Sequence, residues 1–145
     1  MAVDHKAADY WFTKAASLGN PTAYFFLACL MVNGDRAGTP EEAAADAEIA
    51  ARRHNAQAAA LYGRMVMTGK GVPMDKVEGA YWMRRAVRNG SAWGEFLLGV
   101  ALTRGDSVLR DEAAGLAMQA KAARDGFDDS AAPALMRPAL MRPAP

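Results

Sequence analysis

The sequence predicts an all-α protein, an α-solenoid of about seven helices arranged as antiparallel pairs. A motif that starts at Asn20 returns at Asn55 and again at Ser91, which sets a period of 35 to 36 residues. A fixed period of this length is typical of solenoids, in which each unit covers an apolar face of its neighbour. The composition agrees, since 52% of the residues are hydrophobic and many of these are Ala, Leu and Met, which are strong helix formers.

The repeated motif predicts the first helix of each repeat, which we call the A helix. Asn20, Asn55 and Ser91 are residue types that cap helix N-termini by accepting hydrogen bonds from unpaired N–H groups. A glycine stands just past each expected C-terminus, where a left-handed backbone is common. Between these ends, a small residue and a bulky residue four positions later share one face, and a second small residue follows. The predicted A helices are 21–33, 56–68 and 92–104.

A second helix type, the B helix, occurs four times along the chain. Its expected N-caps are Asp4, Thr39, Asp75 and Asp111, and the predicted B helices are 4–18, 40–53, 76–89 and 112–125. In three copies a large residue (Trp11, Trp82 or Met118) lies between small ones, a pattern with which packed helices interdigitate. Asp46 stands at this position in the remaining copy. Either the packing of that repeat is locally thinner, because no large side chain fills this position, or Ile49 turns inward to compensate.

These helices give one repeat domain over residues 1–126. It comprises an unpaired B helix at 1–19 and complete repeats at 20–54, 55–90 and 91–126. The unpaired helix either caps the solenoid or is left from a longer array, and we favour the second interpretation. Residues 127–145 contain a tandem Pro-Ala-Leu-Met-Arg pentapeptide, and prolines at this spacing prevent a stable helix. We expect a flexible Pro/Ala-rich tail there; a docking peptide for a neighbouring groove is the alternative.

The stretch from Asp75 to Gly105 carries the clearest set of motif residues, with a capped B helix around Trp82 followed by the A-helix pattern. By this pattern, repeated in register over residues 4–126, the chain resembles the Sel-one-like repeat family, a relative of the tetratricopeptide repeats. The resemblance implies a right-handed, TPR-like superhelix of antiparallel helix pairs that acts as an adaptor and binds proteins. Asp46 at the tryptophan position and His54 at a glycine position depart from the family pattern.

Composition and motifs argue against several other classes of protein. The net charge of +1 gives no basic excess to attract nucleic acid. We expect a soluble, cytoplasmic chain, because it has no apolar run long enough for a membrane span and no apolar segment typical of a signal peptide. The single cysteine excludes an intrachain disulfide, and the two histidines, His5 and His54, have no second ligand at metal-binding spacing. We find no catalytic constellation, and therefore expect no cofactor, no metal and no enzymatic activity.

These inferences favour a non-enzymatic protein–protein interaction module, an adaptor, scaffold or regulator whose concave groove binds a peptide or protein surface. In related solenoids the A helices line that groove, and aromatic and arginine side chains are frequent anchors of interfaces. The expected groove residues are Phe25, Cys29, Arg64, Met67, Trp93, Phe96 and Val100. For Phe25 and Phe96, packing on the next helix is the alternative.

A different class of function remains open, that of a structural or self-assembling repeat protein. In this interpretation the exposed repeat ends stack on copies of the same chain. The unpaired first helix and the interrupted last unit suit it, because the ends of a solenoid need a cover. Light scattering distinguishes the two classes.

Overall fold

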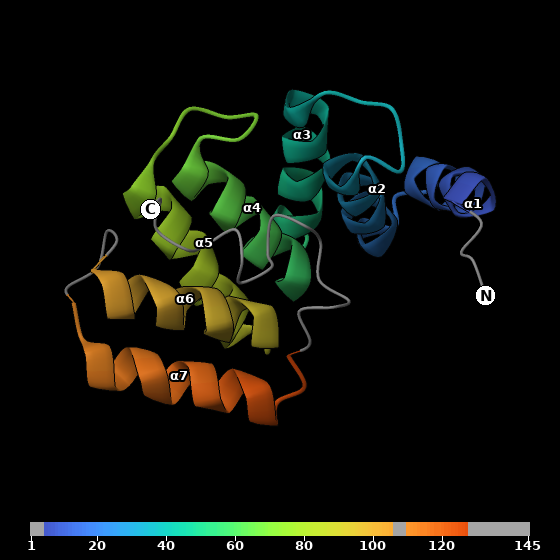
Figure 1. Cartoon of the computed structure of the whole chain (residues 1–145). Coiled ribbons are helices and arrows are strands. Elements are labelled where there is room, and N and C mark those ends of the chain that lie inside the picture. The colour runs from blue at the N-terminus through green and yellow to red at the C-terminus, as the bar shows by residue number, and fades with distance from the viewer. Residues whose placement is uncertain (1–4, 106–109, 128–145) are drawn as a thin grey trace.

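The computed structural model describes residues 5–105 and 110–127. Within these residues the chain forms seven α-helices and no strand (Figure 1): α1 (His5–Ser17), α2 (Pro21–Asn33), α3 (Pro40–Arg52), α4 (Ala56–Thr68), α5 (Lys76–Arg88), α6 (Ala92–Arg104) and α7 (Glu112–Arg124). Each helix begins and ends within one residue of its predicted bounds, which confirms the all-α prediction. The predicted cap Asp4 lies outside the described residues, as does the expected tail of residues 127–145 except for Phe127.

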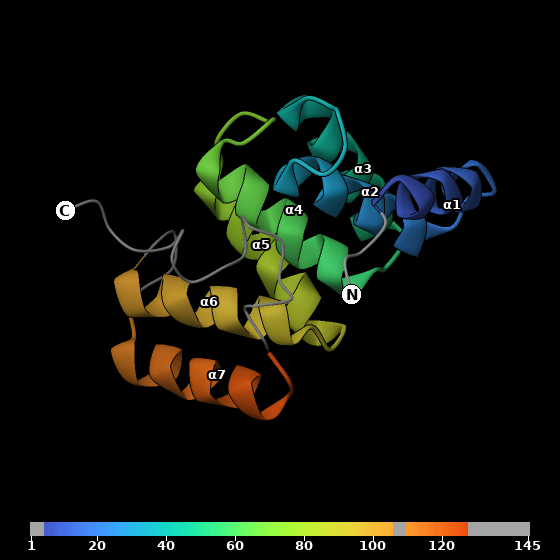
Figure 2. The same cartoon turned by 45° about the vertical axis from the view of Figure 1, so that its right-hand side comes forward.

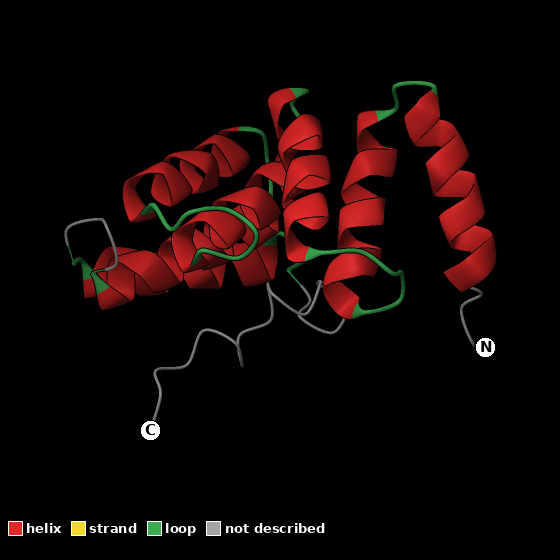
Figure 3. Cartoon of the chain, turned by 90° about the horizontal axis from the view of Figure 1, so that it is seen from above, coloured by secondary structure: helices red, strands yellow, loops and turns green. Residues whose placement is uncertain are grey.

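The helices form antiparallel pairs that stack into a solenoid. The A helices are α2, α4 and α6, and each is followed by the B helix that packs on it: α3, α5 or α7. Helix α1, the unpaired B helix, lies beside α2, and it stands with α7 at opposite ends of the stack (Figures 1 and 2). The pairs rotate along the stack, so that α6 and α7 run across the direction of α2 and α3 (Figure 3).

The predicted caps fix the helix ends. Six side chains accept a hydrogen bond from a backbone N–H in the first turn of the helix that follows: Asn20, Thr39, Asn55, Asp75, Ser91 and Asp111. The A helices end, as predicted, at glycines with a left-handed backbone, Gly34, Gly69 and Gly105. These are local interactions between near neighbours in sequence, which is why a single sequence is enough to place them.

Glycine pairs allow the two helices of a repeat to approach closely. A Cβ atom on Gly63 of α4 would lie 2.9 Å from the carbonyl oxygen of Gly79 in α5, closer than non-bonded carbon and oxygen atoms come. Gly99 of α6 and Gly115 of α7 repeat this arrangement. Only residues without a side chain fit at these crossings.

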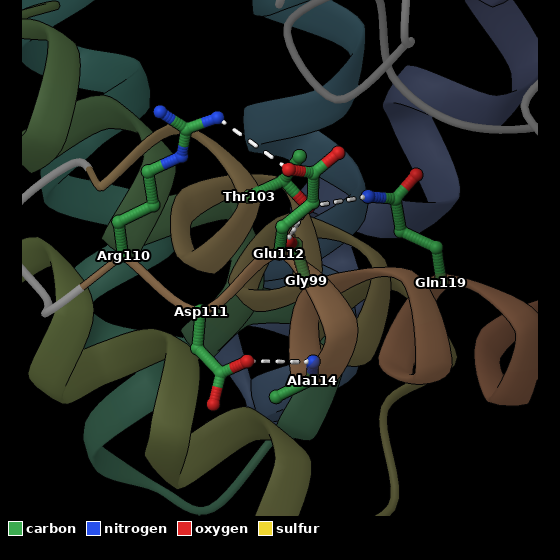
Figure 4. Close-up of polar contacts among 7 residues, drawn as sticks. All are labelled: Gly99, Thr103, Arg110, Asp111, Glu112, Ala114 and Gln119. Atoms are coloured by element: carbon green, nitrogen blue, oxygen red, sulfur yellow. Dashed lines mark hydrogen bonds and ion pairs between the residues drawn. The ribbon is translucent and has the colours of Figure 1, made fainter.

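Polar contacts reinforce the last pair at the end opposite the N-terminus of α6 (Figure 4). Thr103 donates a hydrogen bond of 2.9 Å from its hydroxyl to the carbonyl oxygen of Gly99, and accepts one of 3.2 Å from Nε2 of Gln119. The carboxylate of Asp111 accepts from the backbone N–H of Ala114 at 3.0 Å. Helix α7 is thereby both capped and tied to α6.

The hydrophobic core lies between the A and B helices of successive repeats. Its largest fully buried side chains are Phe25, Leu61, Met65, Val66 and Met83. Trp82 is also buried, at 3% exposed, and its ring meets that of Tyr62 edge-on with centroids 5.4 Å apart. The arginines Arg52 and Arg85 lie over the same indole ring.

The equivalent positions in the other B helices are not filled in the same way. Trp11 is 61% exposed, because within the described residues no A helix covers the outer face of α1. Asp46 is half-buried; burial raises the pKa of its carboxyl, and the nearby charge of Arg36 opposes that shift. Ile49 is only partly buried, and the buried residues of α3 are all alanines. The B helix of the first full repeat therefore contributes smaller side chains to the core than α5, which contributes Trp82.

Candidate binding site on the inner helix face

All seven residues predicted to line a groove lie on A helices. Phe25 and Cys29 belong to α2; Arg64 and Met67 belong to α4; Trp93, Phe96 and Val100 belong to α6. The three A helices are neighbours in the stack, since α4 packs on both α2 and α6. The structure does not expose the predicted residues equally.

Phe25 and Met67 correct the prediction, because they belong to the core. They are 1% and 5% exposed. The ring of Phe25 packs against that of Trp93, with centroids 5.9 Å apart, so the first and third A helices touch at this point. The alternative interpretation for Phe25, packing on the next helix, is right in that the ring is buried, but the ring of Trp93 that it contacts lies on α6 rather than on the next helix, α3.

The five other predicted residues are partly exposed: Cys29, Arg64, Trp93, Phe96 and Val100. Phe96 stacks almost parallel on Phe127, at 4.4 Å between centroids. Burial raises the pKa of the Cys29 thiol well above its usual range, which leaves it protonated and unreactive. The accessible part of the predicted groove is therefore centred on α6 and on Arg64.

A cavity of about 580 Å³ opens at one end of this inner face, beside the N-termini of α2, α4 and α6. It is lined by residues 21–22 at the start of α2, by residues 53–57 and 89–93 in and after the turns that join α3 to α4 and α5 to α6, and by residues 125–126 after α7. Trp93 is the one predicted groove residue in its wall. Trp93 therefore connects this cavity to the buried ring of Phe25.

His54 is the unusual residue of the cavity wall. Its φ is +68°, in the left-handed region, whereas the equivalent residues of the other repeats are Gly19, Gly90 and Gly126, with φ between +85° and +93°. A residue with a Cβ atom pays about 1 kcal/mol for this conformation. The sequence shows His54 as a departure from the glycine pattern, but its backbone angle and its place in the cavity require the structure.

Positive charge collects at the His54 end of the cavity. Arg53 donates from a guanidinium nitrogen to the carbonyl oxygen of Gly19 at 3.0 Å, and its guanidinium lies over the ring of Tyr24. A guanidinium nitrogen of Arg85 lies 3.4 Å from Nδ1 of His54. Because arginine is only a donor, Nδ1 accepts in this contact, which leaves the hydrogen of a neutral imidazole on Nε2.

The carboxylate at the other end of the cavity is already paired. Lys121 lies 2.6 Å from Asp125 and 2.7 Å from Glu95, a residue that is 3% exposed. The hydrogen bond from Lys121 lowers the pKa of the Asp125 carboxyl. Sequence reasoning missed Glu95, whose burial against α7 no local pattern signals.

The described residues show no arrangement that would hold a metal ion. No three His, Cys, Asp or Glu side chains gather at ligand spacing in residues 6–105 and 110–127. Over the same residues, no helix has both the length and the apolar character that crossing a bilayer requires.

Comparison with known proteins identifies the repeat. The family model described as the Sel1 repeat matches residues 2–20, 56–91 and 94–127. A search among curated proteins found no match. Among solved structures, the chain is similar to a protective antigen of uropathogenic Escherichia coli that displays an SLR fold. That match has 32% identity and a TM-score of 0.72, and covers 81% of this chain and 25% of the other.

Two further solved structures are similar. A Sel1 repeat protein from Oxalobacter formigenes is 28% identical with a TM-score of 0.73, over 88% of this chain and 52% of that one. Cysteine rich protein B of Helicobacter pylori has the same fold, at 22% identity and a TM-score of 0.64, over 88% and 92%. The chain spans a quarter to a half of the length of the first two relatives. With family-model matches over most of its helical region, it belongs to the Sel1 repeat family.

Proposed function

We propose that this protein is a non-enzymatic adaptor or scaffold that binds a peptide or protein surface on the inner face of its A helices. Sel1 repeats are helical modules of protein–protein interaction, and their fold is generally a non-catalytic scaffold. The proposal goes further, because it places the contact on α4 and α6 and names the side chains that make it: Arg64, Trp93, Phe96 and Val100.

The observation that carries the proposal is the position of Trp93. Its ring is partly exposed, is held on one side by the buried ring of Phe25, and forms part of the wall of the 580 Å³ cavity. An aromatic ring that is held in place in the wall of a cavity loses little conformational freedom when a partner binds, and aromatic anchors of this kind contribute strongly to interfaces.

A peptide selection tests this function. Random peptides displayed on phage are selected on the wild-type protein, and the affinity of the best binder is measured for Trp93→Ala and Trp11→Ala. Trp11 is the matched control, since it is an exposed tryptophan on α1, away from the groove. We expect Trp93→Ala to weaken binding roughly tenfold or more, as loss of an interface anchor does.

Circular dichroism establishes that each variant has kept its helices. A folded Trp93→Ala protein with unchanged affinity contradicts the proposal, as does an equal loss in Trp11→Ala. Trp93→Phe keeps a ring against Phe25 and should retain most of the binding.

A second candidate function is self-assembly through the end formed by α1. Tyr10 and Trp11 are 60% and 61% exposed, and exposed aromatic clusters of this kind often mark association surfaces. Two copies would then cover this face for each other. Light scattering over a range of concentrations tests the idea with wild type and Trp11→Glu. A wild-type mass that stays monomeric at every concentration refutes it.

A further inference from the structure

We propose that the cavity beside His54 binds a carboxylate of the partner peptide, with Arg53 and His54 as the donors and the Trp93 ring against the neighbouring apolar side chain. The proposal rests on the function above for the class of partner, and it adds the chemical group that is recognised and the residues that recognise it.

The first argument is that His54 is not explained by the fold. Its left-handed backbone suits glycine, and the other repeats have glycine there. A Cβ atom built on the equivalent Gly90 would meet nothing within 4 Å, so this turn has no packing space that a side chain must fill. His54 is itself exposed and lines the cavity. A strained position that retains a polar side chain at a cavity points to a role in binding.

The second argument is the supply of hydrogen-bond donors. Of the five N–H groups of Arg53, one donates to Gly19, and Tyr24 lies beneath the guanidinium and orients it. The contact with Arg85 occupies Nδ1 of His54, so Nε2 is available as a donor. Among the described residues, no carboxylate forms an ion pair with Arg53 or His54. Planar guanidinium groups bind carboxylates with two parallel hydrogen bonds.

The third argument concerns the rest of the cavity wall. Among the described residues that line it, the only acidic one, Asp125, is already bound by Lys121, so it does not neutralise the Arg53 end. Trp93 supplies an aromatic ring in the same wall. A ligand that matches both features carries an anionic group next to an apolar side chain, as an acidic peptide does.

Three short peptides test the inference. N-acetyl-Ala-Phe with a free carboxyl terminus carries a terminal carboxylate, N-acetyl-Glu-Phe amide carries a side-chain carboxylate, and N-acetyl-Gln-Phe amide is the neutral match of the second. Binding is followed by NMR from the indole N–H of Trp93 and the backbone amide of His54. We expect the better acidic peptide to bind roughly tenfold more tightly than the neutral one, and its identity shows which carboxylate is recognised.

Three variants complete the experiment. His54→Gly restores the glycine of the other repeats, so we expect it to fold, to melt about 4 °C higher, and to lose most of the preference for the acidic peptide. Arg53→Gln should lose the same preference. Arg104→Gln removes an equal charge at the opposite end of α6 and should keep it.

The possible failures are distinguishable. If acidic and neutral peptides bind equally, or if His54→Gly and Arg53→Gln keep the preference, the cavity does not recognise a carboxylate, although binding at Trp93 stands. If none of the three peptides shifts either signal, the cavity proposal is wrong, and the phage selection decides separately whether the inner face binds peptides. An equal loss in Arg104→Gln would assign the preference to overall charge.

Discussion

The two tryptophans at equivalent positions of the B helices offer a direct test of what holds the solenoid together. Trp82 lies between α4 and α5 and is 3% exposed, whereas Trp11 is 61% exposed and its ring contacts Tyr10 and Lys14 of its own helix. Replacing each with alanine removes the same atoms from the same repeat position. Any difference in stability therefore reports the contribution of the covering A helix.

The expected magnitude follows from burial. A tryptophan side chain buries about 150–250 Å², which at about 25 cal/mol per Å² corresponds to about 4–6 kcal/mol, and Trp→Ala changes in cores cost about 3–5 kcal/mol. We therefore expect Trp82→Ala to lower the free energy of unfolding by about 4 kcal/mol. Less than half of the surface of Trp11 is buried, so its replacement by alanine leaves no cavity. We therefore expect Trp11→Ala to cost about 1 kcal/mol or less.

Urea unfolding followed by circular dichroism measures both values, with comparable slopes showing that the variants unfold over the same surface. Trp82→Phe keeps an aromatic ring against Tyr62 and should lose less than Trp82→Ala. The reasoning is refuted if Trp82→Ala costs less than about 2 kcal/mol, or if Trp11→Ala costs as much as Trp82→Ala.

Three further outcomes follow from particular contacts. Gly63→Ala brings a Cβ atom to 2.9 Å from the Gly79 oxygen and should destabilise the protein by about 1–2 kcal/mol in urea; an unchanged midpoint would show that α4 and α5 can separate without loss. Since the Lys121 hydrogen bond lowers the pKa of Asp125, the pair stabilises the fold above pH 3.8 and loses this effect as the pH falls below it. An NMR titration should place the Asp125 pKa below 3.8 and Lys121→Met should raise it, whereas identical curves would show that the ion pair does not form in solution. Because burial raises the pKa of Cys29, a thiol reagent at neutral pH should modify it slowly in the folded protein and quickly in urea; rapid reaction in both would place it in solvent.

The sequence predicted the helices well because their signals are local. Each cap residue acts within three positions along the chain, and the spacing of small and bulky residues describes one helix face. The fold class therefore needed no information about distant contacts. The pattern of a large residue between small ones occurs at both Trp82 and Trp11, but only Trp82 is buried, because burial also needs the preceding A helix.

The exposure of the predicted groove residues could not be found in this way. Whether Phe25 faces a ligand or the core depends on how far the stack turns between the first and third repeats, and that rotation is the sum of many packing contacts. Glu95 is buried by α7, and the cavity forms between turns from several repeats. His54 stood out in the sequence, but only the backbone angle and the cavity give it a physical meaning.

The contact between Phe25 and Trp93 bears on how the molecule unfolds. In an ideal solenoid each repeat touches only its neighbours, so the chain can fray one unit at a time from either end. Here an aromatic pair joins α2 to α6 and bypasses the repeat between them. Opening of the first repeat then removes a support from the third. The amide hydrogens of these two helices should consequently exchange with solvent in one cooperative event, rather than in the order of their distance from the ends.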